Sequence, residues 1–227
     1  MIARFNDRRD AGRRLAARLA GYAHRDDVIV LALPRGGIPV GYEVATALGV
    51  PLDVFVVRKL GLPWHEELAM GALASGGVMV LDQDIIRVAR VSDSEVNRVI
   101  ASEELELERR ERLYRGKRIF PDLRGKTVIL VDDGLATGST IRAAIIALRE
   151  EHPARIVAAV PVAAPETCDA IAEIADEMIC AETPEPFHSV GLWYADFGQT
   201  TDEEVHRFLE DARTGAQPAE HHAAGPA

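Results

Sequence analysis

Several short runs of consecutive apolar residues, each ending in a glycine or a polar loop, limit most strongly how this chain can fold. The runs are Val28–Leu33, Leu52–Val57, Val128–Val131, Ile156–Val162 and Met178–Ala181. Continuous apolar strands predict a mostly parallel sheet that is buried on both faces. Because stretches with helical periodicity follow these runs, we predict an α/β fold in which helices cover both faces of a mostly parallel sheet.

The chain has 227 residues, which suits one elaborated domain or two small ones at about 150 residues per domain. A chain of this size buries roughly 70% of its unfolded surface, so its core needs no disulfide or structural metal. We expect a single domain over residues 1–213, with a final helix capped by Thr201 and Glu204 and running to about Asp211. Residues 214–227 lack an apolar pattern, and we expect a disordered tail there.

The segment between the second and third apolar runs does not fit the alternation of strand and helix. Gly61 to Gly77 has the glycine content of a loop, whereas Ser92 to Arg115 has the pattern of one long helix. Ser92 with Glu95 forms a capping-box pattern, and acid-before-base pairs four residues apart predict a helix that largely faces water. We expect this insertion, residues about 60–118 and here called the hood, to act as a lid.

The charge balance and the two cysteines exclude several classes of protein. With 26 Lys and Arg against 36 Asp and Glu, the net charge is -10. This balance argues against a nucleic-acid-binding protein, because such a protein needs clustered Lys and Arg. Cys168 and Cys180 match no metal-ligand or redox spacing, so we expect two separate packing residues in a protein of the reducing cytoplasm. The arginine-rich start and the lack of about 18 consecutive apolar residues predict neither a signal peptide nor a membrane span.

The segment from Val128 to Thr140 combines a buried strand, two acids, a loop of small residues and the start of a helix. A helix N-terminus suits a phosphate because it presents unpaired N–H groups and the positive end of the helix dipole. The loop adds three hydroxyls, on Thr137, Ser139 and Thr140. Asp132 and Asp133 can accept hydrogen bonds from neighbouring sugar hydroxyls, so the pattern indicates a ribose 5-phosphate. A simpler alternative is that Asp132 caps a turn and the hydroxyl residues cap the helix.

Four apolar residues, two acids and then Thr-Gly-x-Thr resemble the signature of the type I phosphoribosyltransferases, which bind 5-phosphoribosyl 1-pyrophosphate (PRPP). The resemblance covers roughly Asp26 to Ala181. It implies that the acid pair, Asp132 and Asp133, holds the ribose hydroxyls and that the phosphate loop holds the 5-phosphate. The phosphate loop comprises Ala136, Thr137, Gly138, Ser139 and Thr140. The Leu-Pro-Arg-Gly-Gly, Arg-Lys-Leu-Gly and Val-Gly-Leu-Trp-Tyr-Ala-Asp-Phe segments are similar to a bacterial branch whose acceptors are unassigned.

The Leu-Pro-Arg-Gly-Gly segment follows the first apolar run, where this family places its pyrophosphate loop. The resemblance implies that Arg35, Gly36 and Gly37 bind the pyrophosphate, with a cis peptide between Arg35 and Gly36. Ligands of open α/β sheets bind where the strand order reverses. If the first and third runs are neighbours at that point, this loop and the acid pair face each other across one crevice.

Arg58 and Lys59 close the second apolar run, and the resemblance makes the following loop, Leu60 to Gly77, a flexible lid over the reaction centre. It also implies that Arg35, Lys59 and Arg58 neutralise the leaving pyrophosphate together with Mg²⁺. The acid pair would hold the magnesium ion through water or substrate oxygens. A lid that excludes water suits a reactive ribosyl centre.

Ala136 stands where the 6-oxopurine branch of the family has an Asp that acts as a base, so a purine-salvage role loses support. We expect the acceptor to be a nucleobase or a similar small planar nitrogen compound. Trp193, Phe187 and Trp64 are candidates for stacking on it. The alternative is that the aromatic residues near the C-terminus hold their loop on the core.

The resemblance therefore implies a cytoplasmic, magnesium-dependent enzyme that takes PRPP and a small acceptor, with no nucleic-acid or membrane partner and with a homodimer as one option. One alternative is a regulatory protein that senses PRPP without turnover, although no helix-turn-helix pattern precedes Val28. Another is a phosphosugar hydrolase, which would need an acidic metal site beyond Asp132, and none is spaced for it.

Overall fold

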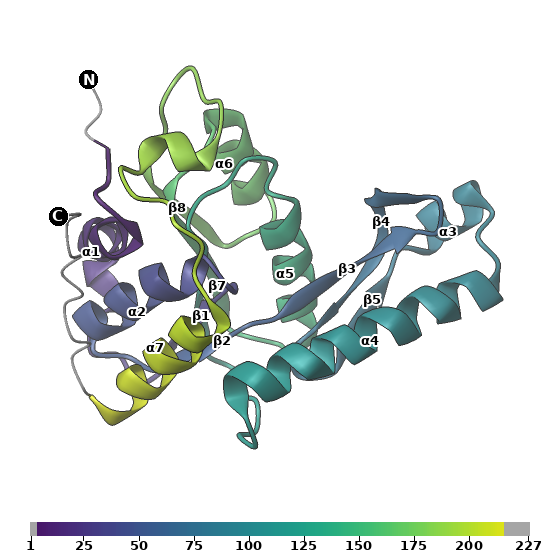
Figure 1. Ribbon diagram of the computed structural model, residues 1–227, viewed down its shortest axis with the longest axis horizontal. Coiled ribbons are helices and arrows are strands. Elements are labelled where there is room, and N and C mark those ends of the chain that lie inside the picture. The colour runs from purple at the N-terminus through teal and green to yellow at the C-terminus, as the bar shows by residue number, and fades with distance from the viewer. Residues whose placement is uncertain (1–3, 216–227) are drawn as a thin grey trace, which may run out of the picture.

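The computed structural model describes residues 4–215, and within them a parallel sheet of five strands forms the centre of the molecule (Figure 1). The strand order is β2-β1-β6-β7-β8, and all neighbours run parallel. The strands are β1 Val28–Ala32, β2 Leu52–Val54, β6 Thr127–Val131, β7 Arg155–Val162 and β8 Glu177–Glu182. The predicted α/β fold with a mostly parallel sheet is confirmed.

Helices cover both faces of this sheet. One face carries α1 (Arg8–Arg18) and α2 (Gly37–Leu48), and the other carries α5 (Ser139–Glu150) and α6 (Pro165–Ala172). Val28 and Val30 pack with the first pair of helices, whereas Ile29 and Leu31 pack with the second pair. Successive side chains of a strand point to opposite faces, so a sheet covered on both faces requires the unbroken apolar runs seen in the sequence.

The order of the strands reverses at β1. The chain passes from β1 to β2 on one side and returns later to β6 on the other side, so β1 pairs with both. The register aligns Leu31 with Leu130 and Ala32 with Val131. The loops that follow β1 and β6 therefore leave the same edge of the sheet side by side, which is where ligands of such sheets bind.

The hood contains a second, antiparallel sheet in the order β3-β4-β5, followed by two helices (Figure 1). Its elements are β3 Val57–Leu62, β4 His65–Ala74, β5 Val78–Leu81, α3 Gln83–Ala89 and α4 Asp93–Arg115. The expectation of a loop over Leu60–Gly77 is therefore wrong for most of its residues, which form the end of β3 and all of β4, and Arg58 and Lys59 lie inside β3. The glycine content suggested a loop, but Gly71 lies within β4, where the neighbouring strand β5 passes very close. A side chain at this position would collide with the Val80 carbonyl oxygen of β5.

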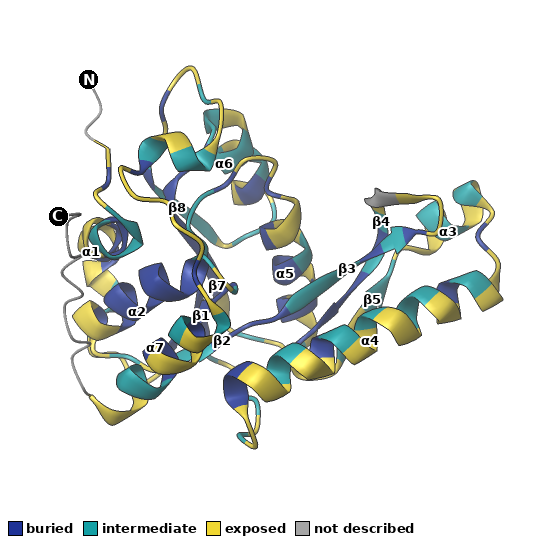
Figure 2. Ribbon diagram, in the orientation of Figure 1, coloured by how far each residue is buried: buried dark blue, intermediate teal, exposed yellow. Residues whose placement is uncertain are grey.

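Both predicted capping boxes are present. The Ser92 hydroxyl accepts from the Glu95 N–H at 3.4 Å, and the Glu95 carboxylate accepts from the Ser92 N–H at 2.9 Å. Thr201 and Glu204 make the same reciprocal pair at the start of α7 (Asp202–Thr214). The long α4 helix exposes much of its outer side (Figure 2), in agreement with its predicted contact with water.

The structure joins Cys168 and Cys180 in a disulfide, so the expectation of two separate packing residues is wrong. Cys168 lies in α6 and Cys180 in β8, and both are half-buried against the core. The short connection after α6 lays this helix beside β8, which brings residues 12 positions apart into bonding distance. No cysteine motif signals this pairing because it depends on how a helix packs beside a strand.

Most of the tail expected to be disordered, residues 216–227, lies outside the described residues. Thr214 is the last residue of α7, and Gly215 caps it with a φ of +70°. Between residues 4 and 215, no helix combines the length and the apolar character that are needed to cross a membrane.

Arg115 attaches the end of α4 to the parallel sheet. Its side chain is 4% exposed, donates to the Val54 carbonyl oxygen at 2.7 Å, and pairs with Asp53 at 3.3 Å and with Glu111 at 2.8 Å. Removing one member of such a group leaves shielded carboxylates without their cation. We expect Arg115→Ala to lower the free energy of unfolding by about 3 kcal/mol in urea titrations. Arg112→Ala, at an exposed position of the same helix, should change it by less than about 0.5 kcal/mol; equal losses would contradict this role.

Candidate active site

The acid pair follows β6 directly and lies against the loop between β1 and α2. A Cβ added to Gly36 would lie 2.0 Å from Oδ2 of Asp133, and one added to Gly37 would lie 2.8 Å from the Val131 carbonyl oxygen and 3.2 Å from Oδ1 of Asp132. Side chains at either glycine would therefore collide with the acids or their backbone. The structure brings the Arg35-Gly36-Gly37 loop and the acid pair together at the point where the strand order reverses.

Arg8 holds Asp133 from a second side, although no motif in the sequence singles this residue out. Its Nε donates to Oδ2 of Asp133 at 2.8 Å, and its Nη1 donates to the Gly198 carbonyl oxygen at 2.6 Å. Its guanidinium carbon lies 3.9 Å from the centre of the Phe197 ring. The Arg8 and Asp133 side chains are 12% and 16% exposed. No local pattern could reveal this contact, because it spans 125 residues.

Burial changes the acidity of both carboxyl groups. It raises the pKa of Asp132 well above its ordinary value, and the charge of Asp133 adds to this increase. Burial also raises the pKa of Asp133, while the charge and hydrogen bond of Arg8 oppose the increase. The two acids are in direct contact, since the Asp133 N–H donates to Oδ1 of Asp132 at 2.8 Å. The site thus concentrates negative charge that a cation or hydroxyl donors would stabilise.

The phosphate loop ends at the N-terminus of α5. Gly138 is the N-cap and has a φ of +69°, a conformation that favours glycine. The other residues of the loop, Ala136, Thr137, Ser139 and Thr140, are exposed. The Thr137 and Ser139 hydroxyls lie 3.4 Å apart. The loop therefore presents hydroxyl groups and a helix N-terminus to solvent, an arrangement that suits an anion.

The sequence matches the family described as "Phosphoribosyl transferase domain" over residues 2–194, which is most of the chain. The chain belongs to this family. A relative from Mycobacterium tuberculosis strain H37Rv, named "Putative phosphoribosyl transferase Rv0571c", is 46% identical over 209 residues, which cover 92% of this chain and 47% of the relative. The chain therefore spans about half the length of the curated relatives that it matches.

Solved structures show the same fold as this phosphoribosyl transferase domain. The crystal structure of TT1426 from Thermus thermophilus has a TM-score of 0.82 and 42% identity, covering 91% of this chain and 97% of that chain. AQ2163 from Aquifex aeolicus has a TM-score of 0.50 and 14% identity, covering 81% and 78%, and is similar in fold alone. The fold that the motifs implied is therefore shown.

The cations expected around the pyrophosphate occupy different surroundings in this phosphoribosyl transferase domain. Nζ of Lys59 donates to Oγ of Ser139 at 3.4 Å, so it reaches the phosphate loop from the hood. Arg58 is its neighbour in β3 and pairs with Glu103 of α4 at 2.6 Å, as expected for side chains that alternate across a strand. The Arg35 side chain is 43% exposed. The structure thus brings Lys59 to the phosphate loop and places Arg58 against α4.

The loop after β1 contains a cis peptide, but one residue earlier than predicted. The bond joins Pro34 and Arg35 rather than Arg35 and Gly36. Gly36 has helical φ and ψ angles of -61° and -33°, and the Gly37 N–H donates to the Leu33 carbonyl oxygen at 3.0 Å. The Arg35–Gly36 bond therefore belongs to the turn that opens α2 and is trans.

The aromatic residues expected at the acceptor lie in two separate elements. Trp64 is 59% exposed, in the turn between β3 and β4 of the hood. Phe187 and Trp193 pack around Tyr194 in an apolar cluster with the N-terminal segment. The Tyr194 hydroxyl donates to the Asp133 carbonyl oxygen at 2.5 Å. This cluster holds the C-terminal loop on the core, as the alternative interpretation supposed, and an acceptor role for the three residues stays a prediction.

The acid pair offers the oxygens that a magnesium ion would need at this site. Among the side chains that the structure describes, which exclude those of residues 66 and 67, no three His, Cys, Asp or Glu residues gather closely enough to form a metal site by themselves. Arg8 occupies Oδ2 of Asp133 and the Asp133 N–H occupies Oδ1 of Asp132, which leaves Oδ1 of Asp133 and Oδ2 of Asp132. Mg²⁺ often keeps several waters and binds one or two carboxylates together with substrate phosphates. Asp132 and Asp133 therefore fit a magnesium ion that binds together with a phosphorylated ligand.

Gly36→Ala tests the close approach of the glycine loop to the acids. The added methyl group overlaps the Asp133 carboxylate and has to displace it from Arg8. We expect a loss of about 1–3 kcal/mol in the free energy of unfolding, because inserted groups strain a packed site. Gly21→Ala is the matched control, since nothing lies within 4 Å of its added Cβ, and it should change stability by less than about 0.5 kcal/mol. Equal melting temperatures for both variants would contradict the close approach.

Asp132→Asn removes the charge of this half-buried acid and keeps its shape. The folded-state pKa of Asp132 lies above the ordinary value of 3.8. As pH rises, the folded protein therefore keeps the Asp132 proton up to a higher pH than the unfolded chain does. Stability of the natural protein therefore falls as pH rises from about 3.8 through the raised pKa. We expect the variant to melt at a higher temperature than the natural protein at pH 8, and at nearly the same temperature at pH 3.5. A constant difference across this range would show that burial of the charge has no cost.

Proposed function

We propose that this chain transfers the 5-phosphoribosyl group of PRPP to a nitrogen atom of a small planar acceptor and releases pyrophosphate. The observation that carries the proposal is the edge of the sheet where the loops after β1 and β6 lie side by side. There, one glycine loop, two contiguous acids and an open helix N-terminus lie together. The pyrophosphate, the ribose diol and the 5-phosphate of one PRPP molecule would occupy these three features in that order.

Each of these three features would have a role in binding PRPP. The phosphate loop would hold the 5-phosphate through its N–H groups and hydroxyls. Asp132 and Asp133 would accept hydrogen bonds from the ribose 2- and 3-hydroxyls. These hydrogen bonds would offset part of the free energy that desolvation of the two carboxylates costs. The Arg35-Gly36-Gly37 loop would bind the pyrophosphate, because its glycines allow backbone N–H groups to approach closely. Lys59 would add a positive charge from the hood.

The reaction forms a bond between the acceptor nitrogen and C1 of the ribose and breaks the bond between C1 and the pyrophosphate oxygen. The pyrophosphate leaves with the bonding electron pair, and the acceptor nitrogen releases its proton to solvent. Positive charge develops on the ribose ring in the transition state, and the acid pair stabilises it. Magnesium, when bound, would neutralise charge on the pyrophosphate. The protein contributes mainly by holding C1 and the acceptor in line.

Arg8 has a positioning role in this proposal. Its ion pair lowers the pKa of Asp133 against the larger, opposite effect of burial and so favours the charged carboxylate, which accepts hydrogen bonds more strongly than a neutral one. Arg58 has no place in the pyrophosphate site in this arrangement, because it pairs with α4. The acceptor, the homodimer and the cytoplasmic location remain predictions. A disulfide in the cytoplasm is uncommon unless it is transient, catalytic or redox-sensing.

Calorimetry with PRPP and Mg²⁺, combined with an assay of pyrophosphate release over a panel of nucleobases and small amines, tests the proposal. We expect PRPP binding and release with at least one acceptor. Asp133→Asn keeps the shape but removes a charge, so it should weaken PRPP binding at least tenfold, a loss of about 1.4 kcal/mol. Glu150→Gln, at an exposed acid on α5, is the control and should bind PRPP as the natural protein does.

The outcomes of this experiment separate the alternatives. Tight PRPP binding without release for any acceptor would replace the enzyme with a PRPP sensor. No PRPP binding, together with phosphate release from phosphosugars, would replace it with a hydrolase. Unchanged PRPP affinity in Asp133→Asn would refute the role given to the acid pair.

A further inference from the structure

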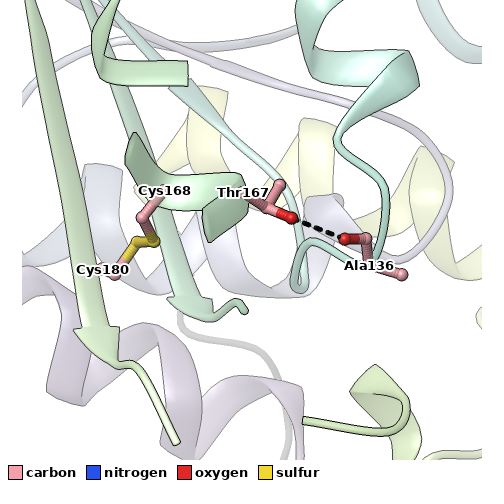
Figure 3. Close-up of a disulfide and its surroundings, with 4 residues drawn as sticks. All are labelled: Ala136, Thr167, Cys168 and Cys180. Carbon is pink, nitrogen blue, oxygen red and sulfur yellow. Dashed lines mark hydrogen bonds between the residues drawn. A yellow bond between two sulfur atoms is a disulfide. The ribbon is translucent and has the colours of Figure 1, made fainter. Parts of the chain in front are cut away.

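The α6 helix forms one wall of the phosphate loop. The Thr167 hydroxyl donates to the Ala136 carbonyl oxygen at 2.8 Å (Figure 3). A Cβ at Gly138 would lie 2.9 Å from Cγ2 of Thr167 and 3.4 Å from Cδ1 of Ile171. The loop thus meets α6 through one hydrogen bond and through direct packing at its glycine. A shift of α6 would change both contacts.

The hydrogen bond from Thr167 also orients the N–H that follows Ala136. The carbonyl and the N–H of a trans peptide point in opposite directions, and the peptide between Ala136 and Thr137 is not among the cis bonds of the described chain. With its carbonyl held toward α6, this peptide directs the Thr137 N–H away from α6. The position of α6 therefore sets the direction of one donor in the phosphate loop.

The disulfide attaches α6 to the edge of the parallel sheet. Cys168 follows Thr167 directly, and its bridge to Cys180 holds the Cα atoms of the two cysteines 7.0 Å apart (Figure 3). Among the described residues of α6, Ile171 alone is fully buried, so this short helix has few other anchors in the core. β8 is the edge strand of the sheet and pairs with β7. The bridge is thus a covalent constraint one residue away from the contact that orients the loop.

We propose that Cys168 and Cys180 form a redox modification site that controls binding at the phosphate loop, with a small or protein-borne dithiol as its reductant. A thiolate of the reductant attacks one sulfur of the bridge to form a mixed disulfide, and its second thiolate releases the pair. Two electrons and two protons pass to the cysteines, which become thiols, and the reductant becomes a disulfide. Both cysteines are half-buried rather than enclosed, which gives a reductant access. This inference rests on the proposed function, in which the loop binds the 5-phosphate of PRPP.

The bridged form is the binding-competent form. With the bridge intact, α6 holds the Ala136 carbonyl, and the loop keeps the geometry that suits a phosphate. Two unbonded sulfurs need more room than two bonded ones, so reduction releases Cys168 from β8 and loosens the neighbouring Thr167. Loss of one hydrogen bond that orients the loop should weaken PRPP binding about fivefold.

The test compares oxidised and reduced natural protein. Thiol titration establishes that the oxidised sample has no free thiols and that the sample treated with dithiothreitol has two. Calorimetry with PRPP and Mg²⁺ should then show about fivefold weaker binding after reduction, at a temperature well below the melting point of either form. Hydrogen exchange at the amides of residues 136–140 should be faster in the reduced form, without any ligand. Equal affinity in the two forms, equal exchange in the two forms, or free thiols in the oxidised sample would each overturn the proposal.

Two variants separate the coupling from a general loss of stability. The double variant Cys168→Ser with Cys180→Ser should bind PRPP as the reduced protein does and should not respond to dithiothreitol. Thr167→Val keeps the bridge but removes the hydroxyl, so the difference between oxidised and reduced forms should shrink to less than about twofold. If Thr167→Val responds to reduction as strongly as the natural protein, the path through Thr167 is wrong.

The failure of this inference can be told from the failure of the proposed function. Absence of PRPP binding in both redox states would refute the proposed function, and hydrogen exchange at residues 136–140 would still decide whether the bridge controls the loop. PRPP binding of equal strength in both states would refute the redox control and leave the proposed function intact.

Discussion

The desolvated pair of carboxylates at the end of β6 is the constraint on which the rest of the site depends. Two contiguous, half-buried acids with largely desolvated carboxyl groups are costly for the folded chain, and their raised pKa values express that cost. The surrounding parts reduce it: Arg8 supplies a cation, glycines leave room, and the backbone of Asp133 binds Asp132 and Tyr194. A site of this kind gives up stability in exchange for a strong preference for ligands that bring hydroxyl donors or cations.

The two ends of the described chain meet at this pair. Arg8 comes from the first helix, and it touches Gly198 and Phe197 from the segment after the last strand. Phe5 and Tyr194 form a further bridge between these segments, with ring centres 5.4 Å apart. The parallel sheet supplies the acids and the loops, whereas the flanking segments supply the groups that keep the acids oriented. The sequence motifs predict the acids and loops of the sheet, but they do not predict the groups of the flanking segments that orient the acids.

Local patterns were enough to predict the features that depend on local physics. Unbroken apolar runs indicated a sheet covered on both faces, and reciprocal caps marked the starts of α4 and α7. Chain direction also placed the acid-rich strand end and the small-residue loop at one edge of the sheet, while their role in binding an anion stays a prediction. The hood sheet was missed since its glycines, such as Gly71, look like loop residues until a neighbouring strand is present. Arg8 and the bridge between Cys168 and Cys180 were missed because each depends on packing between elements.

The β3 strand connects two parts of the molecule through consecutive residues. Lys59 reaches Ser139 at the start of α5, whereas Arg58 is paired with Glu103 in the middle of α4. The backbone of β3 is fixed by its ladder of hydrogen bonds to β4. The long helix of the hood and the first turn of α5 are consequently tied to one short piece of strand, so the hood and the parallel sheet are joined by side chains as well as by the chain itself.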